Sequence, residues 1–192
     1  MKSHLIAVGD RRLVAATKLG FQMVCLAMVL GVLSPWLTAI AADEEGCVVL
    51  PDRRTRFSGP IGREGDIGEI LATRERTGGA FGVFLIEIAP NSGPPAHIHR
   101  GEDEFFYVLK GEFHFKLGER LVSAPPGSFV FAPRDKVHTF QNIGKEPGLL
   151  LVSVTPAGLE KLFEERQGVD AETQKALFKK YRLDIVGPPL GK

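Results

Sequence analysis

The chain has 192 residues, of which 44% are hydrophobic and 24% are charged, a composition typical of a globular protein with one main domain. The formal net charge of +1 implies no nucleic-acid-binding surface, so we expect no nucleic-acid partner. Without its first 41 residues, the remaining chain of about 150 residues is long enough to bury roughly 70% of its unfolded surface in a core.

Residues 1–41 have the features of an export signal. Four basic residues precede an uncharged stretch from Leu19 to Ala42, and Ala39-Ile40-Ala41 is a small-x-small cleavage site. The Arg11-Arg12 pair is compatible with twin-arginine export, and an ordinary basic region is the alternative. An uncleaved membrane anchor is a second interpretation, because the 24 uncharged residues could span a bilayer. We expect a periplasmic or extracellular protein that leaves the membrane after signal cleavage.

Signal cleavage changes both the charge and the cysteine content. It removes four basic residues and one acidic residue, so the formal net charge changes from +1 to −2. It also removes Cys25, which leaves Cys47 without an intramolecular partner. We expect Cys47 to be a free, buried thiol, with a disulfide between chains as the alternative. Closely spaced glycines then interrupt residues 42–80, where we expect loops with edge strands or a lid.

Residues 81–155 contain short apolar or alternating runs separated by turn residues about every 8 to 12 positions, a pattern typical of an all-β sandwich or barrel. The sequence predicts seven strands: Phe81–Ile88, Glu104–Leu109, Glu112–Leu117, Arg120–Ser123, Phe129–Ala132, Val137–Asn142 and Leu149–Val154. Within Glu112–Leu117 the apolar side chains share one face, so His114 is expected on the solvent-facing side and not at a metal.

Two stretches of this region carry the residues best suited to chemistry. His97 and His99 are two residues apart, so on a strand they point to the same side, about 6.6 Å apart along the chain. Glu104 follows five residues later, and His138 lies in a downstream strand. Three imidazoles and one carboxylate suit a divalent transition metal (Fe, Mn, Co, Ni, Cu or Zn) better than calcium or magnesium, which prefer oxygen ligands.

The spacing of these residues follows two motifs, H-x-H-x4-E-x6-G in His97–Gly111 and G-x5-P-x4-H-x3-N in Gly127–Asn142. This pair of motifs resembles that of the cupin superfamily, with eight fixed positions matching over 46 residues. The resemblance implies a cupin barrel (a double-stranded β-helix or jelly roll) with one metal ion inside it. It also implies the ligands of that ion: His97, His99, Glu104 and His138.

Two turn positions depart from the motif pattern. Asn91 stands where the first motif usually opens with glycine, and Asp135 stands where the second motif usually has the glycine of P-x-G. Asparagine and aspartate tolerate a left-handed backbone better than most residues. We therefore expect both turns, and the site between them, to be kept.

After residue 155 the pattern becomes helical. Pro156 fits the first turn of a helix capped by Thr155, and Asp170 can cap a second helix, Ala171–Tyr181. The tail Ile185–Leu190 contains one glycine followed by two prolines and is not expected to be helical. We therefore expect two C-terminal helices and a tail in residues 156–192. They could cover the barrel mouth or a subunit interface, or simply pack against the barrel.

This C-terminal part also carries a resemblance. The stretches P-A-G-x-E at 156–160 and G-P-P-L at 187–190 are similar to those of single-domain cupins related to quercetin (flavonol) dioxygenases. The resemblance implies a metal-dependent dioxygenase that acts on an aromatic or enolic, flavonol-like small molecule together with dioxygen. Glu104 would be its catalytic general base. A homodimer is the usual expectation from the family.

The expected site has two further features. Four protein ligands leave one or two positions open on a five- or six-coordinate ion, as in catalytic metal sites. Barrel phenylalanines are candidates for an apolar pocket that suits a planar aromatic ligand: Phe84, Phe106, Phe113, Phe115, Phe131 and Phe140. The alternative functions are a non-catalytic cupin that binds a metal and a ligand, and a cupin isomerase or decarboxylase.

Overall fold

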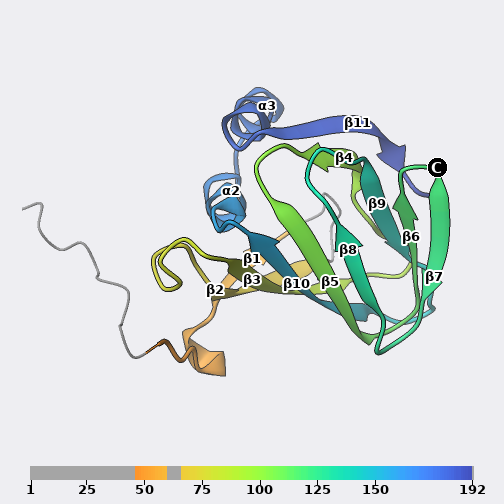
Figure 1. Cartoon of the computed structure of the whole chain (residues 1–192), viewed down its shortest axis with the longest axis horizontal. Coiled ribbons are helices and arrows are strands. Elements are labelled where there is room, and N and C mark those ends of the chain that lie inside the picture. The colour runs from red at the N-terminus through yellow and green to blue at the C-terminus, as the bar shows by residue number, and fades with distance from the viewer. Residues whose placement is uncertain (1–45, 60–65, 192) are drawn as a thin grey trace, which may run out of the picture. The chain divides into compact units, whose positions relative to one another are not determined.

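The computed structural model describes residues 46–59 and 66–191, which contain two antiparallel sheets and two α-helices that lie between the last two strands of the chain (Figure 1). One sheet has the order β1 (Thr55–Ser58), β2 (Ile67–Ala72), β3 (Gly82–Ile88), β10 (Gly148–Thr155), β5 (Asp103–Lys110) and β8 (Phe129–Ala132). The other has the order β11 (Leu183–Pro189), β4 (Pro95–His99), β9 (His138–Asn142), β6 (Phe113–Leu117) and β7 (Arg120–Ala124). The predicted all-β jelly-roll barrel is confirmed.

The seven predicted strands are all present, and each end lies within one residue of its expected position. Their alternating side chains form the core between the two sheets. In β10, for example, Leu150, Val152 and Val154 are buried, whereas the residues between them are half-buried. The same alternation buries Phe113 and Phe115 of β6 and leaves His114 half-buried on the other face, as predicted.

Two helices follow β10: α2 (Leu159–Glu165) and α3 (Ala171–Lys180). Asp170 caps α3 as predicted, because its side chain accepts a hydrogen bond from the backbone N–H of Thr173. The predicted cap of α2 at Thr155 is wrong. Thr155 ends β10, where its hydroxyl donates to the Ala80 carbonyl, and Gly158 is the N-cap of α2.

The C-terminal tail is a strand, which the sequence analysis missed. β11 pairs with β4, placing Leu183 opposite His99 and Ile185 opposite His97. Glycine and proline conceal this strand in the sequence, but proline is tolerated at a sheet edge because its missing N–H then costs no ladder hydrogen bond. β11 is such an edge, and its register shifts on either side of Gly187. The tail therefore covers the free side of the strand that carries two of the candidate ligands.

Two expectations about individual side chains are wrong. Cys47 is free but exposed, because it lies in the segment before β1 and not in the core. Phe131 belongs to the outer face of the barrel, where it stacks on Phe105 beside the exposed Tyr107 and Phe129. On an edge strand the alternation decides which face is buried, and in β8 it buries Val130 and Ala132. The predicted homodimer stays a prediction.

The two turns that depart from the motif pattern adopt the expected backbone. Asn91 has φ of 58° and Asp135 has φ of 63°, both in the left-handed region that favours glycine. The backbone N–H of Asp135 donates to the carbonyl of His99 at 2.8 Å. This hydrogen bond therefore links the end of β4 to the turn just before β9. Asp135 keeps the turn in place of the usual glycine, as expected.

Gly93 lies where the chain passes so close to β9 that no side chain fits. A Cβ on Gly93 would lie 1.9 Å from the carbonyl oxygen of Phe140. We expect Gly93→Ala to lower the free energy of unfolding by about 2 kcal/mol or more, because β9 would have to move. Urea unfolding measures the loss. Gly101→Ala is the matched control, since a Cβ there meets nothing within 4 Å. Equal losses in both variants would contradict this account.

The predicted export signal in residues 1–41 lies outside the described residues and stays a prediction. Within residues 46–59 and 66–191, the structure contains no helix that is long and apolar enough to cross a membrane.

Candidate metal centre

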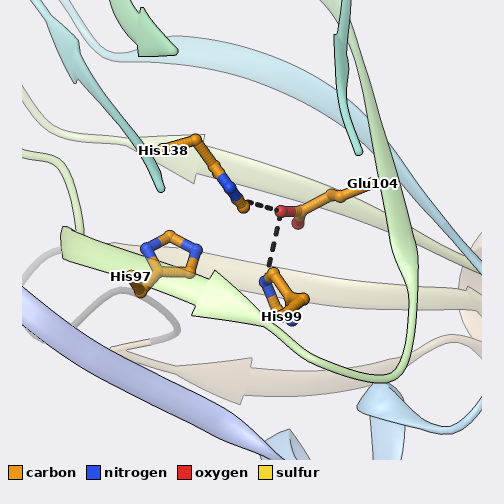
Figure 2. A group of neighbouring side chains, drawn as sticks. All are labelled: His97, His99, Glu104 and His138. Atoms are coloured by element: carbon orange, nitrogen blue, oxygen red, sulfur yellow. Dashed lines mark hydrogen bonds and ion pairs between the residues drawn. The ribbon is translucent and has the colours of Figure 1, made fainter. Parts of the chain in front are cut away.

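Four side chains from three different strands meet inside the barrel (Figure 2). His97 and His99 extend from β4, and His138 extends from β9, where it is the register partner of His97. Glu104 comes from β5 in the other sheet. All four are buried, and one potential ligand atom from each lies within 4.8 Å of the others. The structure thus brings together all four residues that the sequence analysis named as ligands.

Glu104 is at the centre of this cluster. Its Oε2 atom lies 2.9 Å from Nε2 of His138 and 3.3 Å from Nε2 of His99. Two ligand atoms that are each about 2.1 Å from one ion, at a right angle, lie about 3.0 Å apart. Each of the two imidazole nitrogens therefore lies at about the distance from Oε2 that separates adjacent ligands on a transition-metal ion.

Backbone carbonyls fix the orientation of two of the imidazoles. Nδ1 of His97 lies 2.8 Å from the carbonyl of Pro95, and Nδ1 of His138 lies 3.1 Å from the carbonyl of Lys136. Such a contact favours the tautomer with the proton on Nδ1, which leaves Nε2 as a lone-pair donor. Nε2 of His138 then faces Oε2 of Glu104 at 2.9 Å, where both atoms are placed to bind the same cation. The donor set fits a bound divalent transition metal.

Burial and close charges govern the protonation of the cluster without an ion. Burial lowers the pKa of His97 to about 3, and His138 and His99 act in the same direction. Burial also opposes a charge on His99, but Glu104 and Glu102 outweigh it and raise the pKa of His99 to about 9. His99 and His138 outweigh the burial of Glu104 and hold its pKa below the usual range. At neutral pH, Glu104 is therefore ionised and His99 is protonated.

This protonation state predicts that metal binding depends on pH. A coordinating imidazole must be neutral, so His99 has to release its proton when the ion binds. We expect the apparent affinity for Zn²⁺ to rise about tenfold per pH unit from pH 7 and to level off near pH 9, where His99 is already neutral without metal. Competition titrations with a chelator measure this slope. An affinity that is constant between pH 7 and pH 8.5 would contradict it, and His114→Ala should leave the slope unchanged.

The cluster opens onto a cavity of about 300 Å³. The barrel contributes Ile86, Phe106 and Phe140 to its wall, so two of the six phenylalanines predicted for a pocket line it. Phe84, Phe113 and Phe115 pack in the core instead. The other side of the cavity comes from the C-terminal segment: Leu159, Leu162, Phe163, Arg166, Gln174, Phe178, Leu183 and Ile185. The predicted C-terminal helices therefore cover the barrel mouth.

Sequence reasoning missed Arg166 and Gln174 as cavity residues. The signal for Arg166 was present, because it continues the apolar stripe of α2 at positions i, i+3, i+4 and i+7 from Leu159. From sequence alone, a charged residue at the end of such a stripe is predicted to be exposed to solvent. Only the positions of the neighbouring elements show that Arg166 lines the cavity. The remaining motif residue, Asn142, has a structural role: its side-chain amide donates to the carbonyls of Ile88 and Glu146.

Comparisons with known proteins support the predicted cupin barrel. Residues 84–154 match the cupin domain family, and this range contains all four residues of the cluster. No curated protein sequence matches the chain.

Several solved structures are similar in fold. The structure of KdgF from a Halomonas species has a TM-score of 0.53 and 16% identity, covering 60% of this chain and 98% of that chain. A predicted oxalate decarboxylase from Thermotoga maritima has a TM-score of 0.51 and 24% identity, covering 57% and 99%. An RmlC-like cupin from Shewanella frigidimarina has a TM-score of 0.50 and 18% identity, covering 59% and 94%. At these identities the likeness concerns the fold alone.

Proposed function

We propose that this protein is a metal-dependent dioxygenase that acts on a compact aromatic or enolic molecule. The proposal starts from the match to the cupin domain family and from the cupin fold. One observation carries this proposal: the buried cluster of three histidines and one glutamate opens onto an apolar, aromatic-lined cavity. A closed structural site would have no such cavity, because its ligands saturate the ion. The cavity volume of about 300 Å³ is at the small end of the range for ligand pockets.

In this function, the residues around the cavity would have separate roles in binding the metal, accepting a proton and holding the substrate. His97, His99, Glu104 and His138 would hold one divalent transition ion. Such an ion would lower the pKa of a coordinated substrate hydroxyl and, if redox-active, would allow reaction with dioxygen. The carboxylate of Glu104, which borders the same cavity, would accept the hydroxyl proton. Phe106 and Phe140 would hold the flat apolar body of the substrate and exclude water from the cluster.

An aerobic assay with a panel of metals tests this function. The protein is stripped of metal and reloaded separately with Fe, Mn, Co, Ni or Cu, and then mixed with a flavonol or a catechol. We expect loss of the substrate absorption band and uptake of oxygen, both requiring metal and dioxygen. Turnover that continues without oxygen would favour the isomerase or decarboxylase alternative. Stoichiometric metal binding without any turnover would favour the non-catalytic alternative.

A further inference from the structure

Glu102 is a buried carboxylate outside the four-residue cluster. Residues 46–59 and 66–191 contain three other buried carboxylates, those of Asp66, Glu104 and Glu160. Asp66 and Glu160 accept hydrogen bonds from backbone N–H groups, which gives both a structural role, and Glu104 belongs to the cluster. The side chain of Glu102 makes no such hydrogen bond, and its one close partner is a ring nitrogen of His99. Because a buried carboxylate is costly without a partner, this contact has to account for its burial.

The ring of His99 has the matching gap. Nδ1 of His97 and Nδ1 of His138 each contact a backbone carbonyl. In the part of the chain that the structure describes, the buried Nδ1 of His99 has no hydrogen-bond partner, and Oε1 of Glu102 lies 3.8 Å from it. The other nitrogen, Nε2, lies 3.3 Å from Oε2 of Glu104. His99 therefore lies between two carboxylates, one inside the cluster and one outside it.

The local geometry of the chain places Glu102 beside this ring. Glu102 lies three residues after His99, in the turn that joins β4 to β5, and directly before β5 begins at Asp103. Side chains of an extended chain alternate between its two sides. Glu102 and Glu104 are accordingly both buried, whereas Asp103 between them is half-buried. Both glutamates thus point into the barrel, on either side of His99.

Backbone hydrogen bonds hold the turn that carries Glu102. The N–H of Asp135 donates to the carbonyl of His99 at 2.8 Å, and the N–H of Arg100 donates to the carbonyl of Arg182 at 3.0 Å. The first bond joins the turn to the chain before β9, and the second joins it to the chain before β11. A residue that orients a metal ligand needs such a fixed support.

Metal binding would give the Nδ1 atom of His99 a proton to share. When Nε2 of a neutral imidazole donates its lone pair to an ion, the one ring proton lies on Nδ1. In a buried site this N–H needs an acceptor. The distance of 3.8 Å is longer than a hydrogen bond, but Oε1 of Glu102 would have to move by only about 0.9 Å to reach the usual 2.9 Å. Rotation of the glutamate side chain is enough for such a movement.

We propose that Glu102 is a positioning residue that acts on the metal through His99. Its carboxylate would accept a hydrogen bond from Nδ1–H of His99, which holds Nε2 toward the ion and makes it a stronger donor. Glu102 thereby does for His99 what backbone carbonyls do for His97 and His138, but with a full negative charge. This inference rests on the metal site of the proposed function and not on its reaction.

NMR of the zinc-loaded full chain with ¹⁵N-labelled histidine tests the contact directly. We expect His99 to bind zinc through Nε2 and to show an Nδ1–H proton that is shifted downfield and exchanges slowly with water. Glu102→Met keeps the length of the side chain without an acceptor, so it should move this signal upfield and speed its exchange. The Nδ1–H signals of His97 and His138 are internal references. A wild-type His99 that binds zinc through Nδ1, or that shows no downfield Nδ1–H, would overturn the proposal.

Zinc affinity measures the effect of this contact on the metal. Chelator competition at pH 9 should give Glu102→Met an affinity about tenfold or more below that of the wild-type protein, because loss of such a partner typically costs 10–100-fold. Glu102→Gln keeps a neutral acceptor and should recover part of the loss. The pH is chosen because little proton competition remains at His99 there, and removal of a neighbouring carboxylate would otherwise weaken that competition and mask the loss.

Controls separate positioning from simpler roles. Asp103→Asn removes the neighbouring carboxylate, which pairs with Arg134, and should keep the zinc affinity within about twofold of the wild-type value. If Glu102 only fills space, Glu102→Met should bind zinc as tightly as the wild-type protein. If any nearby negative charge is enough, Asp103→Asn should lose as much affinity as Glu102→Met. Either result would overturn the proposal. If Glu102→Met does not fold, Glu102→Gln and the wild-type Nδ1–H signal still test it.

Both readouts use zinc and no turnover, so they separate this inference from the proposed reaction. A failed oxygenase assay together with a zinc affinity that depends on Glu102 would refute the reaction and support the positioning role. An active oxygenase whose Glu102→Met variant binds zinc normally would refute the positioning role alone.

Discussion

Glu104→Gln is expected to abolish turnover while most of the bound metal stays in place. Glutamine keeps the shape of the side chain and one oxygen donor, but it has no basic oxygen that can take a proton from the substrate. Loss of a positioned general base typically costs about 10²–10⁴-fold in rate. Oxygen uptake measures the loss of turnover, and elemental analysis of the same samples measures metal content.

The comparison with Glu104→Ala sharpens this test. Alanine removes the contacts of Oε2 with His138 and His99 as well as the base, so metal content should fall further than in the glutamine variant. Turnover should be lost to a similar extent in both variants. If turnover and metal content instead fall in parallel across the two, Glu104 serves only as a ligand and its proposed role as a base is wrong.

Metal binding is expected to stabilise the whole protein strongly, because all four ligands are buried and come from both sheets. At free metal of about 1,000 times Kd, mass action adds about 4.1 kcal/mol to the free energy of unfolding. For a domain of this size, that corresponds to a rise in Tm of roughly 8–16 °C. Calorimetry of chelator-treated and Zn²⁺-loaded protein measures the shift.

Single histidine variants show whether this stabilisation comes from the described cluster. His97→Ala and His138→Ala should each lose more than half of the metal-induced rise in Tm, because each variant binds the ion with three protein ligands instead of four. The rise is compared within each variant, because removal of a buried ring also lowers the stability of the metal-free protein. His114→Ala should keep the full rise, as His114 lies outside the cluster. A rise that survives in all three variants would place the metal elsewhere.

Much of the fold could be predicted because it depends on local rules, and the set of four candidate ligands could be predicted from such rules together with the motif resemblance. Two-residue periodicity places His97 and His99 on one side of a strand and separates His114 from the core face of β6. Backbone sterics explain why Asn91 and Asp135 can replace glycine at left-handed turns. The motif resemblance added Glu104 and His138, and the buried cluster in the structure agrees with it.

Predictions failed where a pattern had more than one local meaning. The tail that contains Gly187 and two prolines has no strand signal of its own, and it becomes β11 only because β4 offers it a free edge. Phe131 resembles the other barrel phenylalanines in sequence, yet the face it occupies depends on which side of β8 meets the core. The exposure of Cys47 depends in the same way on where the segment before β1 lies.

The sequence by itself thus determined seven strands of residues 81–155, the turns between them and the type of donor atoms, since each follows from the sterics and periodicity of neighbouring residues. Local rules could not place Glu104 of one sheet beside three histidines of the other, which only the motif resemblance implied, and the tertiary structure alone decided that Arg166 shares a cavity with them. Both juxtapositions depend on long-range strand pairing and on the packing of α2 through Phe163. Such contacts join residues whose separation along the chain carries no information about their distance in space.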